Sequence, residues 1–189
     1  MHDGFLKERL CCESPNNVDY SRLLLHLKEL HLESLRESVT WRLPFSNLTC
    51  LKVKSCNSFS YLFKSSIARS LTKLQKMDII ECESIEEIVS KKEGEESNED
   101  EIIFPHLSCL NLETLGRLRW FYQGSLTFTL LEELSITNCK EMVTLCACTL
   151  EAVKLSEVII NFHKCYLMKT DLNSTILEEF LEEVRVSFF

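Results

Sequence analysis

The stretch from Phe45 to Phe63, FSNLTCLKVKSCNSFSYLF, decides the fold, because its apolar residues follow one spacing rule. The rule is L-x-x-L-x-L-x-x-C-x-x-F-x-x-L, and it runs from Leu48 to Leu62. The same six-point pattern returns from Leu74 to Ile88 and again from Leu131 to Leu145. A spacing that recurs in this way predicts a chain built from structural repeats.

Further copies of the pattern are less regular. One runs from Leu107 to Phe121 with leucine in place of cysteine, one begins at Leu27, and a degenerate copy begins at Leu155 and has His163 in the cysteine position. The repeat lengths are 21, 26, 33, 24 and 24 residues, counted between Leu30, Leu51, Met77, Leu110, Leu134 and Val158. Such periods around an x-L-x-L centre are typical of a leucine-rich-repeat solenoid.

The L-x-L centre has the period of two that turns alternate side chains of a strand to opposite faces. The steps of three that follow suit irregular or 3₁₀ coil that keeps returning to the same interior. The sequence therefore predicts an α/β leucine-rich-repeat solenoid with short parallel strands on its concave face, and irregular coil and short helices on its convex side. We expect an incomplete N-terminal repeat or extension over residues 1–26, about six repeats over 27–165, and a C-terminal amphipathic helix over 171–186.

Two segments have helical periodicity. Residues 65–74, SSIARSLTKL, predict a short convex helix. In the tail, Thr175 with Glu178 could form a capping box, and Asp171 is an alternative N-cap. We expect the tail helix to cover the last rung, because a solenoid end needs a cap; a helix offered to a partner groove is the alternative. Its apolar face is expected to contain Leu172, Ile176, Leu177, Phe180, Leu181 and Val184.

The longest repeat contains a strongly acidic insertion over residues 90–101, SKKEGEESNEDE. It offers no apolar side chain for burial, so we expect a solvated loop. The alternative is a clamp on a basic surface of a partner.

The ten cysteines are interpreted mainly as packing residues. Cys56, Cys82 and Cys139 share one position of the repeat, where a small apolar side chain with a weak S–H donor can serve turn carbonyls. A C-x-C…H-x-C set of Cys146, Cys148, His163 and Cys165 matches no common zinc module, and no metal is predicted. Without disulfides, a signal sequence or a membrane-spanning stretch, the sequence predicts a cytoplasmic protein.

Catalysis and nucleic-acid binding are both disfavoured. The five histidines are isolated and no serine lies in G-x-S-x-G, so neither a catalytic site nor a cofactor site is predicted. His31 is interpreted as a surface residue rather than a base. A pI near 5.2 and the absence of a basic stripe disfavour nucleic acid.

The concave face is the predicted protein-binding surface. Lys52, Lys54 and Lys76 should gather there on adjacent rungs between acidic flanks, so an acidic partner should engage them. The alternative is that these charges serve solubility alone. The expected contact residues are His31, Glu33, Lys52, Lys54, Lys76, Asp78, Ile80, Asn111, Glu113, Ser135 and Thr137, with Glu29, Cys50, Cys109 and Glu133 beside them.

Several longer phrases also carry a family resemblance. NLTCLKVKSCNS, LEELSITNCKEM and the acidic insertion before IIFPHLSCLNLETLGRLRWFYQG resemble the C-terminal leucine-rich repeats of plant coiled-coil nucleotide-binding disease-resistance proteins. The resemblance covers roughly residues 24–176. It implies a cytosolic immune-receptor region that recognises a pathogen effector, or a host protein altered by one, and that restrains the receptor's nucleotide-binding domain.

The sequence lacks two features of that family. It has no G-x-x-x-x-G-K-[ST] phosphate loop and no coiled-coil region, so ATP binding is not carried over. We therefore expect a truncated product or a fragment of a receptor. The alternatives are a stand-alone scaffold and the substrate-selecting arm of a ubiquitin ligase.

Overall fold

A computed structural model describes residues 26–35, 44–91, 101–166 and 172–186 of the chain. Residues 1–25, most of the predicted N-terminal extension, and residues 92–100, most of the acidic insertion, lie outside the described part. None of the helices within the described ranges is both long and apolar enough to cross a membrane.

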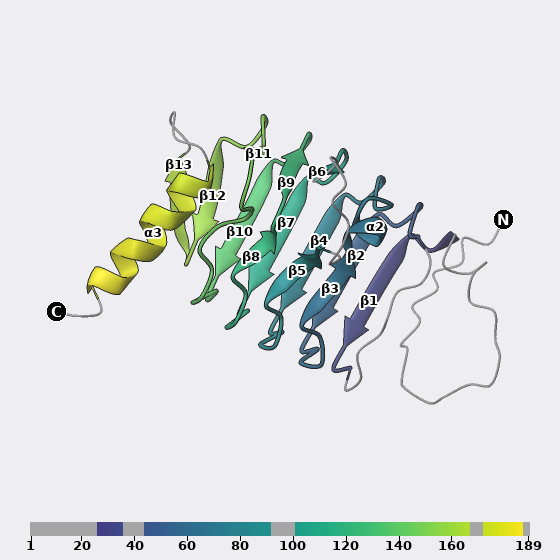
Figure 1. Ribbon diagram of the computed structural model, residues 1–189, viewed down its shortest axis with the longest axis horizontal. Coiled ribbons are helices and arrows are strands. Elements are labelled where there is room, and N and C mark those ends of the chain that lie inside the picture. Colours follow the sequence, from purple (N-terminus) through teal and green to yellow (C-terminus); the bar gives the residue numbers. More distant parts are fainter. Residues whose placement is uncertain (1–25, 36–43, 92–100, 167–171, 187–189) are drawn as a thin grey trace.

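A seven-stranded sheet runs the length of the molecule and is called the long sheet here (Figure 1). Six strands are parallel in chain order and the last is antiparallel to its neighbour. Every predicted x-L-x-L centre is one of the parallel strands, so the predicted solenoid is confirmed. The strands are β1 (Glu29–Glu33), β2 (Cys50–Lys54), β4 (Lys76–Ile80), β7 (Cys109–Glu113), β10 (Glu133–Thr137), β12 (Glu157–Ile160) and β13 (His163–Tyr166).

The repeated apolar positions form one continuous core. In the repeat that defines the pattern, Leu48, Leu51 and Cys56 have no exposed surface, and the equivalent Leu74, Met77 and Cys82 are also fully buried. Strand pairing stacks these residues directly, because Leu51 is in register with Met77, and Met77 with Leu110. A buried side chain of this size contributes about 1.5–3 kcal/mol, and each one depends on the rung beside it.

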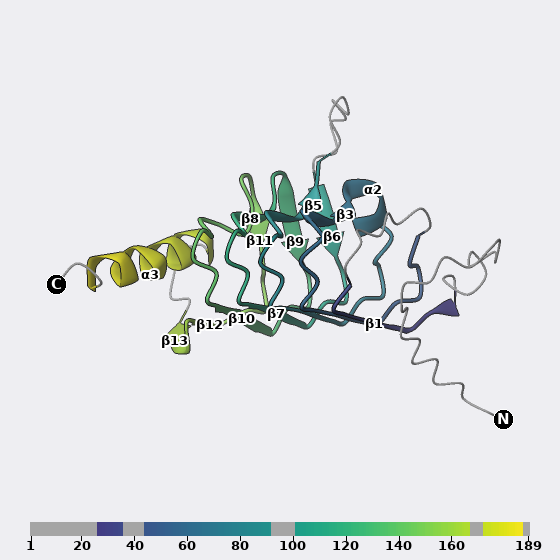
Figure 2. The ribbon, with the colours of Figure 1, turned by 90° about the horizontal axis from the view of Figure 1, so that it is seen from below.

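The side opposite the long sheet is more regular than the sequence analysis predicts. It carries two three-stranded parallel sheets, and Figure 2 shows the strands of both on the upper side, with the long sheet below them. One contains β3 (Tyr61–Lys64), β5 (Glu87–Ser90) and β8 (Trp120–Tyr122); the other contains β6 (Glu101–Phe104), β9 (Ser125–Phe128) and β11 (Leu150–Glu151). Each of these strands is only two to four residues long, too short to give a clear periodicity.

The predicted helix over residues 65–74 is mostly wrong. The helix α2 spans only Ser65–Ala68 and lies beside β3 (Figure 2). Ile67, Ala68, Leu71 and Leu74 are nevertheless all buried. The apolar spacing therefore identified the buried residues. After Ala68, however, turns rather than a helix bring Leu71 and Leu74 to the core.

Aromatic side chains join the two small sheets. Phe104 and Phe128 stack with ring centroids 5.6 Å apart, and Phe121 meets them edge-on at 5.8 and 6.1 Å. The rings come from β6, β9 and β8, and each is at most 1% exposed. The cluster fixes one small sheet against the other.

Strands on both sides of the solenoid limit its curvature. Neighbouring strands stand about 4.8 Å apart, whereas packed helices need about 8–10 Å. Because the strands on the two sides have the same spacing, the solenoid does not need to bend. The long sheet is only weakly curved in Figure 2. The face predicted as concave is thus an almost flat surface.

Each parallel strand is followed directly by a left-handed residue that is not glycine. The residues at this position are Ser34, Ser55, Glu81, Thr114, Asn138 and Asn161, with φ between 45° and 55°. The N–H of the first four donates to the last carbonyl of the following strand, at 2.9–3.0 Å. A left-handed residue with a side chain costs about 1–2 kcal/mol, which these repeated hydrogen bonds and the packing of the rung must offset.

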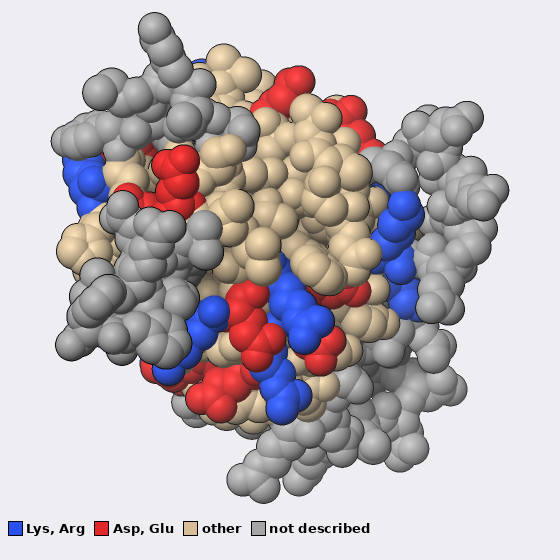
Figure 3. Space-filling model, turned by 60° about the vertical axis from the view of Figure 1, so that its left-hand side comes forward, with Lys and Arg blue, Asp and Glu red and all other residues tan. Residues whose placement is uncertain are grey.

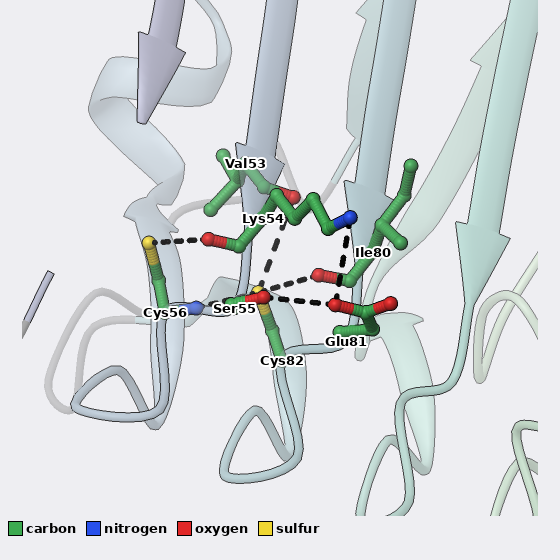
Figure 4. A network of polar contacts seen from close by, with 7 residues as sticks. All are labelled: Val53, Lys54, Ser55, Cys56, Ile80, Glu81 and Cys82. Atoms are coloured by element: carbon green, nitrogen blue, oxygen red, sulfur yellow. Dashed lines mark hydrogen bonds and ion pairs between the residues drawn. The ribbon is translucent and has the colours of Figure 1, made fainter. Parts of the chain in front are cut away.

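The cysteine position closes the turn that follows this left-handed residue (Figure 4). The Sγ atoms of Cys56 and Cys82 donate to the carbonyls two residues before them, Lys54 O at 3.2 Å and Ile80 O at 3.3 Å. The Cys56 N–H in turn donates to Cys82 Sγ at 3.4 Å, which links adjacent rungs. The predicted role of cysteine as a packing residue that serves turn carbonyls is confirmed.

The last rung differs from the predicted sixth repeat. His163 was expected in the buried cysteine position, but it is exposed and begins β13, which folds back antiparallel onto β12. Asn161 and Phe162, with φ of 45° and 69°, form the connecting turn. Two successive positive φ values define the hairpin turn that twists with its strands, and the absence of glycine conceals it in the sequence.

The C-terminal helix α3 (Leu172–Val186) lies at the C-terminal end of the solenoid (Figure 1). Its Asn173 side chain accepts from Leu145 N–H and donates to Cys146 O, both at 3.1 Å. The helix therefore satisfies two backbone groups at the C-terminal end of the repeats, which is consistent with the predicted cap. Leu172 and Ile176 are buried as predicted.

Other details of the predicted tail helix are wrong. Thr175 is buried inside the helix and cannot start a capping box, and Leu177 is 41% exposed. Asp171 and the side chains of Phe180, Leu181 and Val184 lie outside the described part.

Reciprocal substitutions test the left-handed position. Thr114→Asn should raise the free energy of unfolding by up to about 1 kcal/mol, because a β-branched residue is strained at φ 54° and asparagine tolerates it. Asn138→Thr should lower it by a similar amount. Urea unfolding measures both, and a destabilising Thr114→Asn would contradict the account of strain.

A second prediction concerns the cap. Asn173→Ala should lower the free energy of unfolding by about 1–3 kcal/mol, because the two backbone groups of Leu145 and Cys146 lose their partner. Glu178→Ala, on the exposed face of the same helix, is the matched control and should change it by less than about 0.5 kcal/mol. Equal thermal shifts for the two variants would show that the side-chain bridge does not hold the cap.

Candidate functional site

The candidate site is the outer face of the long sheet, the side turned away from the core. Parallel pairing places its side chains in straight rows across the rungs. The central row is His31, Lys52, Asp78, Asn111 and Ser135, and the rows beside it begin at Glu29 and Glu33. The structure thus brings the predicted contact residues onto one surface.

Most of these side chains are at least partly exposed, but one is not. Thr137 is only 4% exposed. Thr137 is the last residue of β10, and its carbonyl accepts from Thr114 N–H at 2.9 Å and from Cys139 Sγ at 3.5 Å in the turn that follows. It is a poor contact residue, and its place in the predicted binding face is wrong.

The three lysines lie on adjacent strands, and two of them already have acidic neighbours. Lys76 Nζ is 3.5 Å from Asp78 Oδ2. Lys54 Nζ is 3.7 Å from Glu81 Oε2, which also accepts from Ser55 Oγ at 2.9 Å (Figure 4). Lys52 has no carboxylate within ion-pairing distance in the described ranges.

The charge of the outer face changes sign along the solenoid. Strand β1 contributes two glutamates, β2 two lysines, β4 one lysine and one aspartate, and β7 and β10 one glutamate each. Three lysines therefore face five carboxylates. The positive charge is a narrow stripe formed by Lys52 and Lys54 on β2 and Lys76 at the start of β4, rather than a broad basic patch.

Charges of both signs are also mixed elsewhere on the surface. Figure 3 views the molecule towards its C-terminal end and shows blue and red side chains interspersed along the lower edge, beside a broad uncharged area. Loops that follow the long strands carry such pairs, as between Arg119 Nε and Glu141 Oε2 at 3.5 Å. Isolated exposed pairs of this kind contribute little to stability.

The titratable groups of the outer face suit binding rather than chemistry. Burial raises the pKa of the Cys109 thiol to about 11, and a hydrogen bond with Glu133 adds to the rise. Burial also raises the pKa of Cys50, with Glu29 and Asp78 acting in the same direction. Both thiols are protonated at neutral pH, and a protonated thiol is a poor nucleophile. The Asp78 carboxylate raises the pKa of Lys76, which stays charged.

The remaining candidate groups do not assemble into a site. His31 is exposed and lies 4.0 Å from Glu29. Cys146 Sγ donates to the carbonyls of Cys148 and Thr149. Across the ranges that the structure describes, no three His, Cys, Asp or Glu side chains are grouped so that they could hold a metal ion.

Sequence reasoning missed the far edge of the outer face. Strand β13 extends it, with Lys164 opposite Ile159. Lys164 Nζ pairs with Glu157 Oε2 at 2.7 Å, and Ile159 is 42% exposed. Nothing in the sequence marks this hairpin, because its turn, Asn161–Phe162, lacks the glycine that usually identifies a two-residue turn.

Six stacked rungs with an x-L-x-L strand, a left-handed turn and a nearly flat outer face that no described element covers define a leucine-rich-repeat domain, a fold that generally mediates protein interactions. The family described as plant disease resistance protein RPS2-like, leucine-rich repeats, matches residues 23–165. The chain belongs to this family, as the resemblance in its sequence predicted.

One curated relative is a probable disease resistance protein, At5g63020, of Arabidopsis thaliana. It is 26% identical over 123 residues, which are 65% of this chain and 13% of the relative. The chain therefore spans only a small part of the relative's length. No solved structure matches.

A pair of cysteines tests the register of the repeat. Cys82→Ser should lower the free energy of unfolding by about 1–3 kcal/mol, because it buries a more polar group in the core. Cys50→Ser, on the outer face, should cost less than about 0.5 kcal/mol. Thermal unfolding compares the two, and equal shifts in melting temperature would contradict the assigned faces.

Proposed function

We propose that this chain is the ligand-recognition region of an intracellular plant immune receptor and that the outer face of the long sheet is its contact surface. The family supports the role in plant defence. The observation that carries the choice of surface is the in-register array of polar side chains over β1 to β10. In Figure 2 no described helix or strand packs over this array.

The partner is a protein, either a pathogen effector or a host protein that an effector has modified. The lysine stripe over β2 and β4 favours an acidic segment of that protein. Lys52 offers its charge directly. The Lys54–Glu81 pair is exposed at both ends and is worth only about 0–1 kcal/mol, so a partner carboxylate can replace Glu81. The acidic strands on either side would repel an acidic ligand that is out of register.

The restraining role of the region follows from the same proposal. In a longer receptor, the surface that recognises the ligand can also hold the nucleotide-binding domain in its resting state, so that ligand and domain compete. Such coupling requires only that the two partners bind one face with different affinities. The same proposal places the chain in the cytoplasm.

Charge reversal tests the contact surface. A screen against secreted effectors of plant pathogens supplies a binding partner, and titration calorimetry measures its affinity. The triple variant Lys52→Glu, Lys54→Glu and Lys76→Glu should weaken binding at least about tenfold, and the wild-type affinity should fall as salt is raised.

The matched control carries the same change of charge away from the outer face. Arg117→Glu, Lys140→Glu and Lys154→Glu alter exposed loop residues and should leave the affinity within about twofold. Equal losses for both triple variants would reduce the effect to net charge. Unchanged binding by the outer-face variant would refute the proposed surface.

A further inference from the structure

A row of three side chains on the opposite side of the solenoid is independent of the outer face. Parallel pairing in the small sheet of β3, β5 and β8 puts Tyr61 beside Glu87 and Glu87 beside Trp120. All three side chains are partly exposed. A carboxylate therefore lies on the surface with an aromatic residue on either side.

The Glu87 carboxylate is held in place by neutral donors. Its Oε2 atom accepts from Trp120 Nε1 and from Gln123 Nε2, both at 3.3 Å. Both donors use one oxygen, which orients the charge, and within the described residues Oε1 accepts no hydrogen bond. Some other carboxylates on this molecule have basic neighbours instead, as Glu141 has Arg119 and Glu157 has Lys164. Throughout the described ranges, no basic nitrogen comes within ion-pairing distance of Glu87.

The spacing of the row fits a flat cation. Tyr61 and Trp120 are two strands apart, or about 9.6 Å, so a cation placed over Glu87 is about 5 Å from each strand position beside it. Cation–π attraction acts within about 6 Å of a ring centroid. Guanidinium can both stack on a ring and donate to a carboxylate, whereas ammonium is a compact, strongly hydrated charge.

From this geometry we propose a second interaction surface: the row Tyr61–Glu87–Trp120 binds an arginine side chain of a partner protein. The arginine donates to Glu87 and lies against the two rings. The chain's formal charge of −8 assists the approach of a basic segment. This surface lies on the side opposite the outer face and does not depend on its function.

Fluorescence of Trp120 gives a direct test. The chain contains two tryptophans, so Trp41→Phe leaves Trp120 as the single reporter. The probe is a short capped peptide, Gly-Arg-Gly. In the comparison peptide the arginine is replaced by citrulline, its uncharged isostere. The arginine peptide should change the fluorescence saturably, and the citrulline peptide should bind at least about tenfold more weakly.

Two glutamates on neighbouring positions provide matched variants. Glu87→Gln should weaken binding of the arginine peptide at least about tenfold, whereas Glu86→Gln, an exposed residue with the same change of charge, should stay within about twofold. Circular dichroism confirms that both variants are folded. No saturable change, or equal losses for the two variants, would overturn the proposal, and equal binding of a Gly-Lys-Gly peptide would overturn the assignment to arginine.

Discussion

In-register parallel pairing of the long strands is the constraint on which the rest of the structure depends. It stacks Leu51 on Met77, Met77 on Leu110 and Leu110 on Leu134, so each apolar residue is buried by its equivalent in the next rung. A slip of one residue in a single strand would turn its leucines to solvent and its lysines or glutamates into the core. The stability of each rung is therefore inseparable from that of its neighbours.

The same register repeats everything that is not in the core. The left-handed turn, the thiol that donates to the carbonyl two residues earlier and the hydrogen bond to the next rung recur because the backbone positions coincide. Strain at Ser55 or Glu81 is tolerated because the turns on both sides hold the conformation. Side chains that point outward also fall into rows, which gives the molecule ordered surfaces.

Two such surfaces face opposite directions, and their chemistry differs. The outer face of the long sheet alternates in charge, and the Lys54–Glu81 pair at its edge is exposed at both ends. The small sheet instead holds the carboxylate of Glu87 with neutral donors between two aromatic residues. A nearly flat solenoid can present both surfaces at once.

The sequence by itself determined the repeats, the faces of the long strands and the role of the cysteines, because a period of two and a fixed cysteine position leave a visible pattern. The tertiary structure alone decided the small sheets, the short α2, the burial of Thr137, and the turn at Asn161 that makes β13. Strands of two to four residues and a hairpin without glycine have no local signature. They form because neighbouring rungs present unpaired backbone groups at the correct spacing, and the same pairing brings Tyr61, Glu87 and Trp120 together from three separate repeats.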